Sequence, residues 1–181
     1  MILTVGHSTR PIEEFIALLR AHGVRTLVDI RTVPRSRHNP QFNRDTLPES
    51  LKPAGIAYRH LPSLGGLRHP RADSPNTAWR SAGFRGFADY MRTREFAAAL
   101  EGLIHLSERN QIAIMCAEAV PWRCHRSLVS DALAARGVPV GHILSPARRE
   151  PHALTSFAQV EGTTVTYPAN PEQPSLLHSA E

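Results

Sequence analysis

Two cysteines, a histidine and three charged side chains lie close together in the segment CAEAVPWRCHR. Cys116 and Glu118 follow an apolar run, and Cys124, His125 and Arg126 begin a pattern typical of a helix. A thiol near a helix start has a lowered pKa, because the helix dipole and free N–H groups stabilise its anion. A neighbouring carboxylate or imidazole can transfer protons or attack a substrate. The segment therefore predicts a catalytic site.

Other interpretations of this segment stay open. Cys116 can be a small core residue and Cys124 a buried helix cap, while Trp122 either stacks on a base or covers the core. Cys, His and Glu also bind metals, but adjacent Cys124 and His125 match no common zinc spacing. We predict no cofactor and no metal ligand, with a bound metal as the alternative.

Polar residues and glycines also follow the three strands predicted earlier in the chain. They are His7 and Ser8, then Asp29, Arg31 and Ser36, and finally Tyr58, His60, Gly65 and Gly66. We expect Asp29 to be catalytic and the others, together with Trp122 and Arg126, to bind substrate.

Each of these residues also has a structural interpretation. Asp29 and Arg31 can simply pair to hold a loop, since a buried carboxylate needs a partner. His7 or His60 can be a core histidine, and Ser8 can cap the following helix.

Alternating strand and helix patterns place these residues in a common framework. Apolar runs predict strands at 2–5, 25–30, 56–61, 111–116 and 138–144, and helical periodicity is strongest at 11–23, 84–93, 94–110 and 124–137. The order predicts an α/β fold, with one mainly parallel sheet of about five strands and helices on both faces. Such sheets bind ligands beyond the carboxyl ends of their strands, so the polar residues should share one crevice.

The chain is expected to form one α/β domain, residues 1–145, followed by an extension, residues 146–181. A possible edge strand at 161–167 and a proline-rich, disordered tail at 168–181 are predicted within the extension.

Net charge and composition favour an anionic partner and argue against a membrane partner. The formal net charge is +5, with 20 Arg and one Lys, which suits an anionic partner. We expect a small anionic or nucleotide-like ligand; DNA or RNA, gripped by Arg-rich loops at 31–44 and 68–80, is the alternative. No apolar run is long enough for a membrane span and no signal peptide is evident, so we expect a cytoplasmic protein and no membrane partner. The oligomeric state is left open.

Four motifs in this order, VGHST, VDIRTVPRSR, YRHLPSLGG and IMCAEAVPWRCHR, resemble the family called domain of unknown function 488. The resemblance implies that the family's motif residues are the candidate site residues named above, except Trp122, together with Pro34, but it implies no established activity. A looser likeness to rhodanese-type sulfurtransferases and cysteine phosphatases implies thiol chemistry at Cys116, although the loop here is longer and lacks a glycine-rich ring of amides. An enzyme of unknown reaction is therefore expected, with a nucleic-acid-binding or DNA-repair-associated module, or a non-catalytic regulator, as alternatives.

Overall fold

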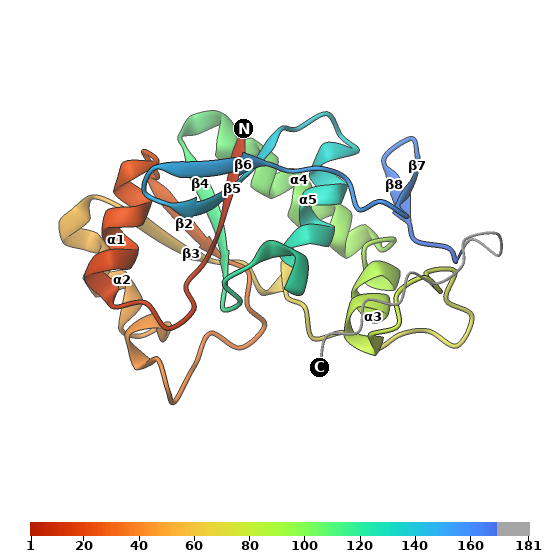
Figure 1. Ribbon diagram of the computed structural model, residues 1–181, viewed down its shortest axis with the longest axis horizontal. Helices are drawn as coiled ribbons and strands as arrows, with labels where there is room; N and C mark the ends of the chain where they lie inside the picture. The colour runs from red at the N-terminus through yellow and green to blue at the C-terminus, as the bar shows by residue number, and fades with distance from the viewer. Residues whose placement is uncertain (170–181) are drawn as a thin grey trace.

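A six-stranded, mostly parallel β-sheet forms the centre of the computed structural model, which describes residues 1–169 (Figure 1). In spatial order its strands are β3 (Ala57–His60), β2 (Thr26–Asp29), β4 (Ile112–Cys116), β1 (Ile2–Gly6), β5 (Val140–Ser145) and β6 (Arg148–Pro151). All pairings are parallel except that of β5 with β6. The predicted α/β fold is confirmed, with one strand more than expected. β6 was missed because its sequence, RREP, is polar and mostly exposed.

Helices cover both faces of the sheet, as predicted. Within residues 1–169 they are α1 (Ile12–Ala21), α2 (Leu47–Leu51), α3 (Ala82–Tyr90), α4 (Arg94–Arg109) and α5 (Arg126–Ala134). The first two pack on one face, and the other three form the core on the opposite face (Figure 1).

Alternation along the central strands creates these two cores. In β4, Ile112 and Ile114 face the core that contains α4 and α5, whereas Ala113 and Met115 face the core that contains α1. Successive strand residues point to opposite faces, so a continuous apolar run fits a strand that is covered on both sides.

The chain leaves the two adjacent strands β1 and β4 toward opposite faces. Gly6 is paired with Cys116 at their carboxyl ends, but β1 leads into α1 and β4 leads into α5. Diverging connections open a crevice at the edge of a parallel sheet, and open α/β sheets bind their ligands there. The fold therefore opens a crevice at the carboxyl ends of β1 and β4.

The segment after Ser145 packs against the main body. β6 extends the central sheet, while β7 (Gln159–Glu161) and β8 (Thr164–Thr166) form a separate two-stranded sheet. The strand predicted at 161–167 is thus present as β8, but it is not an edge of the main sheet; it pairs with β7 across a turn at Gly162. The disorder predicted for the proline-rich tail concerns mainly residues 170–181, which lie outside the described residues.

None of the helices described between residues 1 and 169 combines the length and apolar character needed to cross a membrane.

Candidate functional site

A cavity of about 370 Å³ lies beyond the carboxyl end of β4. Loops after β2, β3 and β4 form its walls together with the start of α3. Its lining residues are Arg31, Thr32, Val33, Gly66, Leu67, Ser81, Gly83, Phe84, Cys116, Ala117, Glu118, Arg123, Cys124 and His125. A cavity therefore lies at the predicted edge of the sheet and contains four of the five residues expected to be catalytic, but the polar residues do not all share it.

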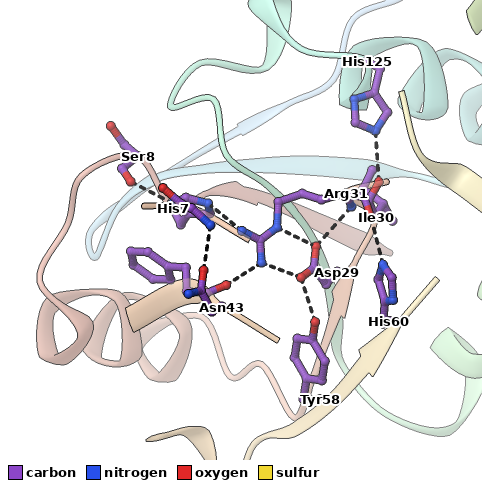
Figure 2. A network of polar contacts seen from close by, with 11 residues as sticks. His7, Ser8, Asp29, Ile30, Arg31, Asn43, Tyr58, His60 and His125 are labelled. Atoms are coloured by element: carbon purple, nitrogen blue, oxygen red, sulfur yellow. Dashed lines mark hydrogen bonds and ion pairs between the residues drawn. The ribbon is translucent and has the colours of Figure 1, made fainter. Parts of the chain in front are cut away.

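Both thiols and the His125 imidazole meet at this cavity. The His125 Nδ1 atom lies 3.7 Å from the Cys124 sulfur and 4.0 Å from the Cys116 sulfur. The other ring nitrogen, Nε2, is 3.3 Å from the Ile30 carbonyl oxygen (Figure 2). A carbonyl only accepts, so Nε2 carries a proton, and Nδ1 is the ring nitrogen that faces the two sulfurs.

The two thiols share one negative charge more easily than they carry two. A hydrogen bond from Cys116 lowers the pKa of the Cys124 thiol, and His125 and Arg126 lower it further. The same interaction with Cys124, together with burial, raises the pKa of Cys116. The pair is therefore best described as a Cys124 thiolate that accepts a hydrogen bond from the Cys116 thiol.

Local backbone geometry explains how adjacent residues point to one place. The short 3-10 helix η4 (Pro121–Arg123) begins with a proline and ends at Cys124, whose backbone is extended with φ −138° and ψ 145°. His125 is already helical, with φ −56° and ψ −11°, and precedes α5. The change from extended to helical backbone between the two residues sends both side chains toward the end of β4.

Two glycines let the loop after β3 close on this cluster. A Cβ atom on Gly66 would lie 2.6 Å from His125 Nδ1, and one on Gly65 would lie 2.3 Å from Thr32 Oγ1. Both positions therefore require glycine for close approach. This favours the packing role of the Gly65–Gly66 pair over a plain turn.

Arg126 braces the loop that carries Glu118. Its side chain is 1% exposed, donates from Nη2 to the backbone carbonyl of Glu118 and lies 3.4 Å from Thr4 Oγ1. A Cβ atom on Gly6 would lie 1.8 Å from the same Glu118 oxygen, so this contact also requires glycine. Arg126 does not line the cavity, and its charge acts on the thiols through the protein interior.

Asp29 and Arg31 form a buried, two-pronged ion pair (Figure 2). Arg31 Nε is 2.9 Å from Asp29 Oδ1 and Nη2 is 2.6 Å from Oδ2, which also accepts from the Tyr58 hydroxyl at 2.8 Å. Asp29 has no exposed surface, and burial beside Asp29 raises the pKa of Tyr58 above its usual value. The structural interpretation of the pair thus fits the geometry, while part of Arg31 still reaches the cavity wall.

His7 continues this network on the side of β1. Its Nε2 is 3.2 Å from Arg31 Nη1, and its Nδ1 donates to the Ser8 carbonyl at 2.7 Å. Burial lowers the pKa of His7 to about 4, which agrees with a neutral ring that accepts from a guanidinium. Ser8 has a left-handed φ of 51° and does not cap α1, whose first residues have no side-chain cap.

His7, Ser8 and Ser36 line a second hollow of about 400 Å³, which adjoins the cavity at Glu118 and Arg31. The Ser36 hydroxyl accepts from the Asn39 backbone, and the Ser36 N–H donates to the Asn43 side chain. Ser36 therefore shapes its own loop as well as facing the hollow.

Neither hollow is lined by Tyr58, His60 or Trp122, and Asp29, Gly65 and Arg126 also lie outside both linings. The Tyr58 hydroxyl donates to Asp29 Oδ2, and the His60 Nε2 atom is 2.8 Å from the Arg31 carbonyl oxygen (Figure 2). Trp122 is 64% exposed and lines a different hollow.

Several cavity residues escaped prediction as binding residues. Arg123 offers an exposed guanidinium, and Val33, Leu67 and Phe84 offer apolar surface; Val33 and Leu67 are 60% and 72% exposed. Arg123 lies inside one of the four motifs, so it could have been predicted from the sequence. The three apolar residues come from separate segments, and only the folded structure shows that these segments meet at the cavity.

The fold and the site define an α/β protein with a thiol–imidazole cavity at the point where its strand connections diverge. The family model described as Domain of unknown function DUF488 matches residues 11–133 of the chain. The chain therefore belongs to this family, which confirms the assignment made from its motifs. Comparisons with curated proteins and with solved structures gave no match.

Proposed function

We propose that the protein is an enzyme that hydrolyses, or transfers a group from, a small anionic or nucleotide-like substrate bound in the 370 Å³ cavity. The convergence of two thiols, an imidazole and a free carboxylate on this cavity carries the proposal. We place it in the cytoplasm, where thiols such as Cys116 and Cys124 stay reduced.

Glu118 fits the role of general acid or base. It is exposed and lines the cavity, and its backbone carbonyl is fixed by Arg126. This contact holds the Glu118 backbone at the cavity wall and leaves its carboxylate oxygens available to a substrate. General acid–base groups contribute about 10²- to 10⁴-fold to rate.

The cavity walls support recognition of a ligand with an anionic and an apolar part. Arg123 offers an exposed guanidinium, which suits a phosphate or carboxylate. Val33, Leu67 and Phe84 offer apolar surface for a flat group such as a base. Asp29, Tyr58 and His7 position Arg31 and the loop after β2 rather than touching the ligand.

Calorimetric titration with inorganic phosphate and a panel of nucleoside monophosphates tests the proposal. We expect saturable binding that Arg123→Gln weakens about 10- to 100-fold, since a hydrogen bond to a charged group contributes about 1.5–3 kcal/mol. Arg94→Gln, an exposed arginine at the start of α4, is the matched control and should bind like the wild type. Glu118→Gln should retain binding and lose at least about 100-fold in turnover of the ligand that binds. Absence of binding across the panel, or equal binding by the Arg123 variant, would contradict the proposal.

Nucleic-acid binding is the second candidate, and exposed basic residues favour it. Arg35, Arg37, His38 and Arg44 lie exposed on the loop after β2, beside the second hollow. Three other arginines expected to contact phosphates are engaged: Arg31 pairs with Asp29, Arg68 covers the Tyr90 ring and Arg71 pairs with Asp73. Arg80, also expected to contact phosphates, is exposed.

Titration of an oligonucleotide at several salt concentrations tests this candidate. It predicts affinity that falls steeply with salt, and a shallower salt dependence when Arg35, Arg37 and Arg44 are replaced by Gln. Binding that does not respond to salt would exclude it.

A further inference from the structure

A three-ligand arrangement suited to a metal ion is preformed at the bottom of the cavity. The sulfurs of Cys116 and Cys124 and a ring nitrogen of His125 all lie within 4.8 Å of one another. Zinc bonds of ~2.3 Å to sulfur and ~2.0–2.1 Å to nitrogen place tetrahedral sulfur and nitrogen ligands about 3.6 Å apart. The observed separations between sulfur and Nδ1, 3.7 and 4.0 Å, are close to this value.

We infer that Cys116, Cys124 and His125 bind one zinc ion, whose fourth position opens into the substrate cavity. Soft thiolates and imidazole are the ligands that zinc prefers, and a site with three protein ligands leaves one position for water or substrate. The bound ion would supply an activated water or polarise a substrate atom there.

The orientation of His125 supports this assignment independently of the distances. Its Nε2 proton is directed to the Ile30 carbonyl, so Nδ1 is the nitrogen available to bind an ion, and it faces both sulfurs. A metal-binding histidine usually donates its second nitrogen to a carbonyl or carboxylate in this way, which fixes the ring and its tautomer. Gly66 closes against the same ring and limits its movement.

Charge and rigidity at the site are also compatible with zinc. The three ligands come from the end of β4 and the start of α5, and both sulfur-bearing residues are buried. The two cysteines can each supply a thiolate, which together offset the two positive charges of the ion. Adjacent Cys124 and His125 can both reach the ion because the backbone changes from extended to helical between them and because Nδ1, the nearer ring nitrogen, is the ligand.

Metal analysis of the full chain, purified with a phosphine reductant and no chelator, tests the inference. We expect about one zinc per chain, and cobalt(II) replacement should give a thiolate-to-cobalt charge-transfer band and the visible bands of a tetrahedral site. Cys116→Ser, Cys124→Ser and His125→Ala should each lose the band and weaken zinc binding at least about 100-fold. His60→Ala is the matched control: this histidine lies near the Arg31 carbonyl but faces another hollow, so its variant should bind zinc normally.

Chelator-treated wild type provides a test that does not depend on the folding of the variants. Added zinc should restore the full metal content and raise the unfolding temperature, as expected when a ligand binds only the native state. A reduced wild type that takes up neither zinc nor cobalt, or cysteine variants that retain the charge-transfer band, would overturn the inference.

The role of the ion as the reactive centre rests on the proposed function, whereas its binding does not. If zinc binds as described but no ligand of the panel binds, the metal site stands and the proposed function fails. If chelated, metal-free protein turns over substrate at the full rate, the proposed function stands and the reactive role of zinc is overturned, leaving the Cys124 thiolate as the nucleophile.

Discussion

At the scale of single residues, the pair of Asp29 and Arg31 shows why a polar motif need not be catalytic. Both carboxylate oxygens accept hydrogen bonds from Arg31, and one also accepts from Tyr58. A carboxylate used in this way has no free oxygen directed to a substrate. Its contribution to function is to hold the loop that carries Arg31 and Thr32 at the cavity wall.

Replacement of Asp29 by Asn should therefore lower stability strongly. It leaves the buried Arg31 guanidinium without its counter-charge, and breaking a buried pair costs about 3–5 kcal/mol of unfolding free energy. Arg71 and Asp73 form an exposed pair with the same spacing, so Asp73→Asn should leave stability nearly unchanged. Urea denaturation of both variants measures this; equal losses would contradict the structural role of Asp29.

His7 should make stability depend on pH. Its pKa is lowered to about 4 in the native state, against 6.5 for the unfolded chain. Between these values the unfolded state binds more protons, so the free energy of unfolding falls as pH decreases from 6.5 to 4, by up to about 3 kcal/mol.

Denaturation as a function of pH compares His7→Asn with His38→Asn, which alters an exposed histidine. The first variant should lose part of the acid sensitivity of the wild type and the second should keep all of it. An unchanged pH profile in the His7 variant would show that this histidine is not held neutral.

At the scale of elements, the connection from β4 through η4 to α5 builds the site and the loop after β3 closes it. The strand and the helix were predictable, because a continuous apolar run and an amphipathic repeat mark them clearly. Contact between Gly66 and His125 was not predictable, since it joins residues far apart in the chain through a close approach that depends on the fold. The sequence therefore identified both thiols and His125, but not the apolar wall opposite them.

Substitution of Gly66 by Ala should disturb the site without affecting the rest of the molecule. The added Cβ would lie 2.7 Å from His125 Cγ and must displace the ring. We expect zinc affinity to fall about 10- to 100-fold, as when an outer contact of a metal ligand is lost. Gly83 lines the same cavity with free space around it, so Gly83→Ala is the control and should bind zinc normally. Competition with a chromogenic chelator measures both affinities, and equal values for the two variants would refute the role of Gly66.

At the scale of the whole molecule, the carboxyl-terminal segment is tied to the helix that carries the site. Asp131 of α5 is buried and accepts hydrogen bonds from the side chains of Thr155 and Tyr167, and it is 2.8 Å from His152 Nε2. None of these partners was predicted, because short polar segments after Ser145 have no periodic pattern. The sheet and its main helices followed from periodicity, whereas this buried network depends on tertiary contacts alone.

The fragment 1–145 should therefore not reach the stability of the longer chain. It lacks β6 and all three of these partners, and a buried carboxylate without donors is strongly destabilising. A chain ending at Ala169 keeps these contacts and is the matched control. Thermal unfolding followed by circular dichroism compares the two; equal unfolding temperatures would show that residues 1–145 form an independent domain.

The rate at which Cys116 and Cys124 are alkylated, resolved by peptide mass spectrometry, tests the central claim that substrate binds over the thiol–imidazole cluster. Chelator-treated, reduced protein would be compared with and without the nucleoside monophosphate that binds best in calorimetry. The account predicts that this ligand slows alkylation of both thiols, with half of the effect at its calorimetric dissociation constant. A ligand that saturates the protein while both alkylation rates stay unchanged would place the binding site elsewhere and contradict the account.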